Sequence, residues 1–376
     1  MTPTDRFTTT LRGGRADRVP VLPKIWLDAA ARLAGLELAE LLPDPAAATR
    51  LIVRVAKTFG FDGARMHLFP ERRVERDGDA LWEQNAAGQR IGRVDLSGGL
   101  AIEPRPPEAF DWSDPATLFS LQFRPALLEE DTAFDWSAVA VPPAAFYEQR
   151  YGPTIRSLLA EQAGDLCCIG DCDTASLPFL ARFRGVQGAM TDLLLQPEFA
   201  RQAFDLGVKF VVQRARFFID CGCRVLRLND SMANMNLISP AQWREFVAPV
   251  FTEVIRQIKA LRPDVLIYCH ICGNVMPVLA DLRQTGLDGI GPLDPLGGMD
   301  VGRAREILGP GYCLLGGVNT LTLAKGTPAD VTAECRSVLT KARARDGAFI
   351  LGSGCALSRL TTAENLGALR DSVDDF

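Results

Sequence analysis

The stretch VLIYCHICGNV, residues 265–275, places a histidine and a cysteine one residue apart, directly after an uncharged apolar run. The chain has only two histidines among its 376 residues. Alternate residues of an extended segment point the same way, so His270 and Cys272 can reach one ion. Imidazole nitrogen and thiolate sulfur are ligands that zinc prefers. The spacing therefore indicates a metal site, and Gly273 would let the backbone turn away after the second ligand.

Cys355, in GSGCALS, follows another apolar run and is the candidate for a third ligand. Three protein ligands leave a fourth position open, as in catalytic zinc sites. Asp294, after a further apolar run, is our candidate for a weak fourth ligand. Spacing alone leaves open an alternative in which a packed histidine lies beside two core thiols.

Eight short apolar runs alternate with longer helical patterns, which predicts a (β/α)8 TIM barrel. The expected strands are residues 19–23, 62–68, 166–170, 224–229, 265–269, 287–293, 312–317 and 348–353. A doubly wound sheet is the alternative, but no Gly-x-Gly-x-x-Gly turn follows the first run. The length fits one barrel domain over residues 1–376.

Residues 74–110 interrupt this alternation with short apolar runs separated by DGD, AAGQ and SGG turns. They predict a β-hairpin inserted after the second strand. Residues 111–150 predict short helices and loops, so the whole insertion covers about 74–150. Further along, Ser239-Pro240 and Thr327-Pro328 are typical helix starts.

Other polar residues follow the expected strands, where a barrel of this type places its chemistry. We expect His67 and Asp230 to act as catalytic residues, and Asp171 and Asn319 to bind a cofactor. The alternatives are a satisfied rim histidine for His67, helix capping for Asp230, and loop hydrogen bonding for the last two. Two arginines inside strands, Arg65 and Arg227, are interpreted as interior ion-pair partners, with anion binding as the alternative.

The composition excludes several classes of protein. A net charge of -5 and a pI of about 5.3 argue against nucleic-acid binding, and no apolar run is long enough for a membrane span. The N-terminus has no apolar segment suited to a signal peptide, so we expect a cytoplasmic protein. In that reducing compartment the ten cysteines are not expected to form disulfides, and most lie in apolar runs typical of core packing.

Several segments, taken in order, resemble the uroporphyrinogen decarboxylase superfamily over nearly the full chain. They are DRFTTTLRGGRADRVPV, ISPAQWREFVAPV, HICGNVMPVLADLRQTGLDGI, LGGVNT, GTPADV and GAFILGSGCALSRLTTAENLGAL. The decarboxylases of that superfamily carry an MRQAGR-like segment after the first strand and a Gly-His-Gly near the last one. This chain reads PKIWLDAAARLAG and GSGCALS at those places. Both departures remove groups that hold a polycarboxylate tetrapyrrole.

The sequence is closer in these motifs to the zinc-dependent methyltransferases of the superfamily. Their His-x-Cys-Gly and late Gly-Cys correspond to His270, Cys272, Gly273, Gly354 and Cys355. The resemblance implies a Zn²⁺-dependent methyl transfer between a small methylated substrate, such as an aryl methyl ether or a thiol-type compound, and a corrinoid (cobalamin). The chain has no Asp-x-His-x-x-Gly corrinoid-binding signature, so the corrinoid is expected on a partner protein.

Two other functions remain open at this stage. One is a metal-independent decarboxylase of a porphyrinogen-like substrate, and the other is a non-catalytic zinc-binding module that supports a corrinoid protein. The direction of methyl transfer is also open, although the insertion favours a small methylated donor. A homo-oligomer is left open as well.

Overall fold

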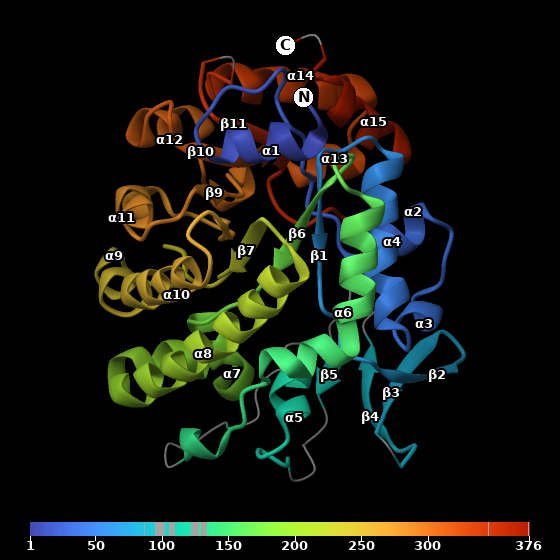
Figure 1. Ribbon diagram of the computed structural model, residues 1–376, viewed down its shortest axis with the longest axis vertical. Coiled ribbons are helices and arrows are strands. Elements are labelled where there is room, and N and C mark those ends of the chain that lie inside the picture. Colours follow the sequence, from blue (N-terminus) through green and yellow to red (C-terminus); the bar gives the residue numbers. More distant parts are fainter. Residues whose placement is uncertain are drawn as a thin grey trace.

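A parallel sheet of seven strands curls through the centre of the molecule and carries helices around it (Figure 1). The computed structural model describes residues 1–85, 87–94, 102–104, 110–121, 128, 134–344, 346–374 and 376, with 91 and 102–104 as backbone only. The strand order is β1-β6-β7-β8-β9-β10-β11, so each strand of this sheet pairs with the next one along the chain. The strands are β1 (Gly63–Met66), β6 (Cys167–Asp171), β7 (Val225–Asn229), β8 (Leu266–His270), β9 (Gly289–Gly291), β10 (Cys313–Val318) and β11 (Phe349–Ser353).

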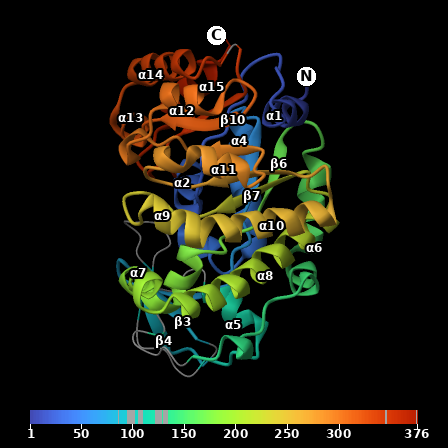
Figure 2. The same cartoon turned by 90° about the vertical axis from the view of Figure 1, so that its left-hand side faces the viewer.

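Helices precede and connect these strands, as the alternation of patterns predicts (Figure 2). They are α1 (Pro3–Leu11), α2 (Leu27–Leu33), α3 (Leu38–Leu41), α4 (Pro45–Thr58), α5 (Pro115–Ser120), α6 (Ala144–Glu161), α7 (Leu177–Leu195), α8 (Pro197–Cys221), α9 (Pro240–Gln242), α10 (Ala248–Leu261), α11 (Leu279–Gln284), α12 (Val301–Leu308), α13 (Thr320–Lys325), α14 (Pro328–Lys341) and α15 (Ala363–Asp371). Short 3-10 turns lie at Trp136–Ala138, Met276–Val278 and Pro295–Gly297, and a π-helical turn at Trp243–Val247 joins α9 to α10. Capping boxes at Ser239 and Thr327 confirm the two helix starts read from the sequence.

The structure of residues 19–23 differs from the regular first strand that the sequence predicts. Val21 forms an isolated parallel bridge to Leu351 within β11, and Lys24 forms another to Ala356 just after β11. On the other side, the carbonyl of Val21 accepts a hydrogen bond of 2.9 Å from the N–H of Asp62, just before β1. Prolines at 20 and 23 lack an N–H donor, which explains why this segment does not join the sheet as a regular strand. Seven of the eight predicted strands are therefore present.

The two faces of the sheet bury different sets of residues. One face packs on α1, whose Phe7 and Leu11 lie against it, and we call this the inner face. A Cβ placed on Gly289 would lie 2.7 Å from Leu11, so the helix sits close to the strands. The inner face carries Cys167, Ile169, Val225, Leu266, Tyr268, Cys313, Leu315 and Ile350. The alternating residues pack on the surrounding helices in the larger cluster, so the strands are buried on both faces and are apolar almost throughout.

The insertion after β1 is built around a second sheet. Its four antiparallel strands are β2 (Arg73–Asp77), β3 (Ala80–Gln84), β4 (Arg90–Val94) and β5 (Ile102–Pro104). The predicted hairpin corresponds to β2 and β3, which pair in register from Arg73 with Gln84 to Asp77 with Ala80. Parts of the predicted 111–150 region lie outside the described residues; α5 and the start of α6 lie within them.

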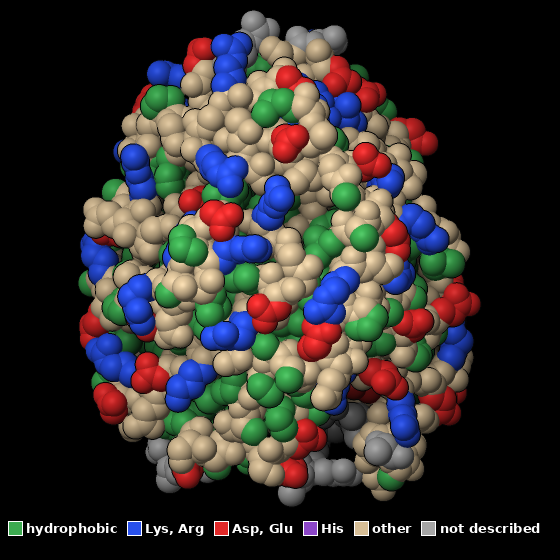
Figure 3. All heavy atoms as spheres, in the orientation of Figure 1, with side chains coloured by type: hydrophobic (Ala, Val, Ile, Leu, Met, Phe, Trp, Pro, Cys, Tyr) green, Lys and Arg blue, Asp and Glu red, His purple; other side chains and the backbone are tan. Residues whose placement is uncertain are grey.

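The insertion and the chain termini lie at opposite ends of the molecule (Figure 1). On the face drawn in Figure 3, acidic and basic side chains are interspersed rather than gathered by sign. Within the described residues, no helix is both long and apolar enough to cross a lipid bilayer.

Candidate metal centre

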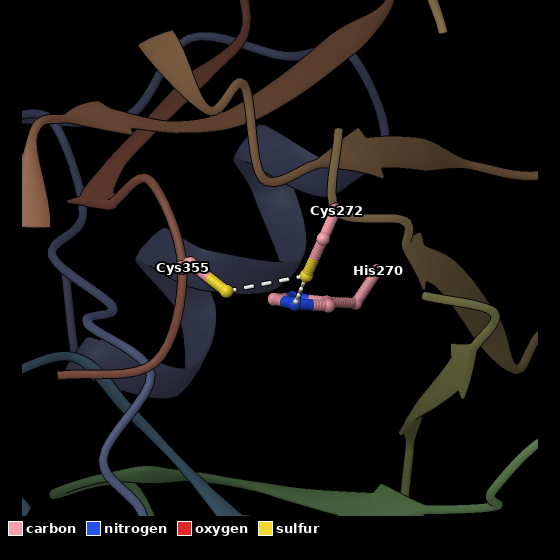
Figure 4. A group of neighbouring side chains, drawn as sticks. All are labelled: His270, Cys272 and Cys355. Atoms are coloured by element: carbon pink, nitrogen blue, oxygen red, sulfur yellow. Dashed lines mark hydrogen bonds between the residues drawn. The ribbon is translucent and has the colours of Figure 1, made fainter. Parts of the chain in front are cut away.

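Three potential metal ligands converge where two distant strands end (Figure 4). His270 is the last residue of β8, Cys272 lies two residues later, and Cys355 lies on the loop after β11. His270 Nε2 is 3.2 Å from Cys272 Sγ, which in turn is 3.2 Å from Cys355 Sγ. The ligand atoms of the three residues all lie within 4.8 Å of one another. The structure therefore brings together the three residues that the sequence analysis selected.

The backbone around the first two ligands is held in an unusual turn. Gly273 has a φ of +77°, a conformation that disfavours any residue with a Cβ. A Cβ at this position would also lie 2.7 Å from Cγ of Asn234. Beyond the turn, the N–H of Asn274 donates to Oδ1 of Asn236 at 2.9 Å, which ties the loop to the segment after β7. The expectation that glycine turns the chain away after Cys272 is confirmed.

The third ligand is positioned by the ends of β10 and β11. The N–H of Gly354 donates to the carbonyl of Val318 at 2.6 Å, and the hydroxyl of Ser353 donates to the carbonyl of Cys355 at 2.5 Å. These bonds fix the loop on which the second thiol is carried. Cys272 and Cys355 are partly exposed, whereas the other eight cysteines are buried, which confirms core packing for those eight.

The two thiols share a hydrogen bond, and this separates their acidities. The hydrogen bond from Cys272 lowers the pKa of Cys355, while the same bond and burial raise the pKa of Cys272. Burial, followed by the positive charge of Lys24, lowers the pKa of His270 well below its usual range. A thiolate and a neutral imidazole are the protonation states in which these groups bind a metal.

Lys24 is a functional candidate that the sequence analysis missed. Its ammonium nitrogen lies 2.8 Å from Nε2 of His270, and its backbone N–H donates to the hydroxyl of Ser353 at 2.9 Å. Burial of the ammonium group, followed by the positive charge of Arg227, lowers the pKa of Lys24 to about 8. The sequence did contain a signal for Lys24, because it is a polar residue directly after the run 19–23 and so marks the end of the first expected strand.

The geometry fits a zinc ion. Zinc–ligand bonds of about 2.0–2.3 Å in a tetrahedron place neighbouring ligand atoms roughly 3.3–3.8 Å apart. The His270–Cys272 and Cys272–Cys355 separations of 3.2 Å are close to these values, and all three ligand atoms lie within 4.8 Å of one another, which is compatible with one ion after side-chain adjustment. Zinc also binds a set of one nitrogen and two sulfur donors more strongly than magnesium or calcium does.

Asp171 lies in a buried ion-pair network on the inner face. Its carboxylate accepts from Arg227 Nη1 at 2.9 Å, from Arg65 Nη1 at 3.1 Å and is 3.3 Å from His67 Nδ1. Despite burial, these cations hold the pKa of Asp171 well below its usual value. The interpretation of both arginines as interior ion-pair partners is confirmed, and a cofactor-binding role for Asp171 stays a prediction.

His67 lies one residue beyond β1, in contact with Asp171 and two aromatic rings. The centroid of its ring is 4.7 Å from that of Trp26 and 4.6 Å from that of Phe69. Burial lowers the pKa of His67, although the hydrogen bond to Asp171 acts in the opposite direction. His67 is not part of the three-residue group around His270. Its catalytic role stays a prediction.

Asp230 is fully buried and connected to the end of β8 through its backbone. Its N–H donates to the carbonyl of His270 at 3.0 Å, and the hydroxyl of Ser176 donates to its carboxylate. Burial raises the pKa of Asp230 to about 7. The carboxyl group therefore loses its proton at a much higher pH than an ordinary aspartate, and its catalytic role stays a prediction.

Asp294 and Asn319 both cap short helical segments. The carboxylate of Asp294 accepts from the N–H of Leu296 at 3.0 Å, and the amide of Asn319 accepts from the N–H of Leu321 at 2.8 Å. Asp294 lies beside the third ligand, because a Cβ on Gly354 would be 3.2 Å from its Oδ1. It is outside the group of ligand atoms within 4.8 Å of one another. Its role as a fourth ligand and the cofactor role of Asn319 stay predictions.

The model of the uroporphyrinogen decarboxylase (URO-D) family matches residues 153–376, which is more than half of the chain. The chain therefore belongs to the uroporphyrinogen decarboxylase family. The matched part includes β6 to β11 and all three candidate ligands.

Some curated relatives are named methyltransferases and others are named decarboxylases. A methylcobamide:CoM methyltransferase of Methanosarcina barkeri is 24% identical over 176 residues, covering 46% of this chain and 48% of the relative. A methylated-thiol–coenzyme M methyltransferase of Methanosarcina mazei is 29% identical over 196 residues, covering 52% and 50%. A uroporphyrinogen decarboxylase of Thermosynechococcus vestitus is 29% identical over 232 residues, covering 59% and 64%. The chain thus spans about half the length of the first of these relatives.

A solved structure extends the likeness in fold to the whole chain. A methyltransferase from Methanosarcina mazei superposes with a TM-score of 0.72, covering 100% of this chain and 99% of that one, at 17% identity. At this identity the match establishes a shared fold.

Proposed function

We propose that this protein is a zinc-dependent methyltransferase that moves a methyl group between a small thiol-type or methylated compound and a corrinoid carried by a partner protein. The observation that carries the proposal is the convergence of His270, Cys272 and Cys355 at the ends of β8 and β11. Two curated relatives are named as methyltransferases acting with coenzyme M, one of them with a methylcobamide, which supports the same chemistry here.

The side chains of this site would hold the ion and determine the net charge of the complete site. Two thiolates and a neutral histidine bring two negative charges to a divalent ion, so the site is formally neutral. When bound, zinc would lower the pKa of a thiol or polarise the heteroatom of a methyl donor. The hydrogen bond from Cys272 lowers the pKa of Cys355, which favours the thiolate form that a metal ion binds.

The transfer itself is a displacement at carbon. Toward a thiol, the methyl group would pass from the partner's corrinoid to the sulfur, the thiol would release its proton, and the corrinoid would keep the bonding electron pair. In the opposite direction, the methyl group would pass to the reduced corrinoid and the substrate heteroatom would keep the electron pair. Because ligands at the carboxyl ends of the strands face the open end of a barrel, the partner would dock there.

We propose that residues 1–376 form one barrel domain in which the irregular segment 20–24 takes the place of the eighth strand, between β11 and the start of β1. Its bonds to Leu351 and Asp62 support this view. The insertion after β1 would then help to shape substrate specificity.

The decisive experiment follows methyl transfer by absorbance under anoxic conditions. Zinc-loaded protein is mixed with methylcobalamin and small thiols, or with cob(I)alamin and methyl thioethers or aryl methyl ethers. We expect transfer in at least one direction, reduced at least 100-fold in Cys272→Ser. Cys221→Ser, at the end of α8 and away from the site, is the matched control and should keep full activity.

Two results would contradict the proposal. One is the absence of transfer in both directions from protein that holds one zinc per chain. The other is release of carbon dioxide from a porphyrinogen by the metal-free protein, which would favour the decarboxylase alternative suggested by the relatives of that name.

A further inference from the structure

The two cysteines of the candidate metal centre point toward one another and form a close pair of thiols (Figure 4). Their sulfur atoms lie 3.2 Å apart, on loops that follow β8 and β11. A disulfide bond is about 2.05 Å long, so the two sulfurs would have to approach by roughly 1.2 Å to form one. Because Cys272 and Cys355 both lie outside the strands, rotation of the side chains can supply a shift of this size.

These two thiols differ from the remaining cysteines in their access to solvent. Cys272 and Cys355 are partly exposed, whereas the other eight cysteines are buried. Burial raises the pKa of Cys167, Cys223 and Cys269 well above the usual value, which disfavours the reactive thiolate form. Within the described part of the chain, no other two thiols share a hydrogen bond. A soluble oxidant should therefore react at this pair before it reacts with the buried thiols.

A positive charge lies close to the pair. The ammonium nitrogen of Lys24 is 2.8 Å from Nε2 of His270, and that nitrogen is 3.2 Å from the sulfur of Cys272. Cysteines that react with oxidants characteristically lie in partly exposed, electropositive surroundings of this kind. The surroundings of the pair therefore favour oxidation as well as metal binding.

We propose that Cys272 and Cys355 are a redox-active pair, which a hydroperoxide oxidises to a disulfide when no metal ion is bound. One thiolate attacks an oxygen of hydrogen peroxide, the O–O bond breaks, and a sulfenic acid and a hydroxide form. The second thiolate attacks the oxidised sulfur, so that the S–S bond forms, the S–O bond breaks and a second hydroxide leaves. The two protons released by the thiols convert both hydroxides to water. Two thiols are thus oxidised to one disulfide, and one peroxide is reduced to two water molecules.

The disulfide and a bound metal ion exclude each other. Zinc binds cysteine sulfur as the thiolate, whereas both sulfurs of a disulfide have lost that charge. Oxidation would therefore release the ion, and reduction by a dithiol would restore the two ligands. The inference depends on the distance between the two sulfurs and on their exposure, and it is independent of methyl transfer.

The test treats zinc-free protein, prepared with a chelator, with hydrogen peroxide and maps the cysteines by alkylation and mass spectrometry. We expect a loss of two hydrogen atoms per chain and a cross-linked peptide pair that joins Cys272 to Cys355. Dithiothreitol should reverse both changes. Cys221→Ser, at the end of α8, is the matched control and should form the same cross-link at the rate of the parent.

Single variants of the pair separate disulfide formation from oxidation of one thiol alone. Cys272→Ser leaves Cys355 without a neighbouring thiol, so its sulfenic acid should proceed to sulfinic acid, which dithiothreitol does not reduce. We expect at least fivefold more sulfinic acid at Cys355 in this variant than in the parent. Cys355→Ser provides the corresponding test at Cys272, and circular dichroism reports whether each variant is folded.

A zinc-loaded sample separates this inference from the proposed function. Disulfide formation that zinc slows at least tenfold, with release of the ion to a chromophoric chelator as the reaction proceeds, would support both. A rate that zinc does not change would support the disulfide and contradict the metal site on which the proposed function depends. A zinc-free parent that keeps both thiols reduced, cross-links other cysteines, or forms as much sulfinic acid at Cys355 as Cys272→Ser does would overturn the assignment of this redox pair.

Discussion

The ammonium nitrogen of Lys24 lies 2.8 Å from Nε2 of His270, the ring nitrogen nearest to the cysteine pair. A cation so close to a metal ligand competes with the ion both for the lone pair and through charge repulsion. We therefore expect Lys24→Met to raise the zinc affinity about tenfold, a change of about 1.4 kcal/mol. Competition with a chromophoric chelator measures this affinity. Lys24→Arg keeps the charge and is the control; an unchanged affinity in Lys24→Met would contradict the idea.

The metal content of cysteine variants tests the ligand assignment directly. We expect about one zinc per chain in the parent, and loss of the ion in both Cys272→Ser and Cys355→Ser, because a serine hydroxyl is a much poorer zinc ligand than a thiolate. Mass spectrometry on tag-free protein gives the metal content, and circular dichroism reports whether the fold is retained. Cys221→Ser should keep its zinc. A parent without zinc under zinc-replete conditions would refute the site.

The turn at Gly273 offers a test of how the first two ligands are held. Gly273→Ala adds a Cβ to a residue with a φ of +77° and places it 2.7 Å from Asn234. We expect a loss of zinc affinity of at least tenfold, because the turn that follows Cys272 must move. Gly35→Ala separates the two causes, since Gly35 has a φ of +67° and no atom within 4 Å of the added Cβ. That variant should lose a little stability and no zinc affinity.

The carboxylate of Asp171 compensates two buried arginines, so its removal should be costly. Asp171→Asn leaves Arg65 and Arg227 without their counter-ion, and the free energy of unfolding should fall by about 3–5 kcal/mol. Urea unfolding followed by circular dichroism measures the change. Asp165→Asn breaks an exposed pair with Lys57 and should change stability very little. Similar losses of unfolding free energy in Asp171→Asn and Asp165→Asn would show that the buried network stabilises the fold no more than an exposed ion pair does.

The carboxyl of Asp230 predicts a pH dependence of stability. Burial raises its pKa to about 7 in the folded protein, above the value of 3.8 expected when unfolded. The stabilisation that results from this shift is complete below pH 4 and is lost as pH rises toward and through 7. We expect Asp230→Asn to remove this pH-dependent loss of stability. Between pH 4 and 7 the free energy of unfolding of the variant should therefore rise relative to that of the parent by up to about 1.4 kcal/mol per pH unit.

Urea unfolding at several pH values measures this difference. Asp205→Asn, an exposed change on α8, is the control for the removal of one charge. A difference between Asp230→Asn and the parent that is constant from pH 4 to 8 would contradict the raised pKa.

The sequence by itself determined the repeating strands and helices and the types of the ligands. Apolar runs and helix caps are local patterns, so seven of the eight strands and the starts at Ser239 and Thr327 could be read directly. The remaining run, residues 19–23, does not form a regular strand because Pro20 and Pro23 lack N–H donors. An apolar run alone does not show this effect. The pairing of His270 with Cys272 was also a local pattern, since alternate residues of an extended segment face the same side.

Only the tertiary structure decided which distant residues meet. Cys355 reaches Cys272 because the loop after β11 is held against β10, and Lys24 reaches His270 through an irregular segment. Asp294 and Asn319 also cap short helical segments, a contact that their positions after expected strands did not show, and their roles in the site stay predictions. A sequence pattern shows periodicity and residue type, whereas the course of each loop and the pairing of buried charges depend on contacts between elements far apart in the chain.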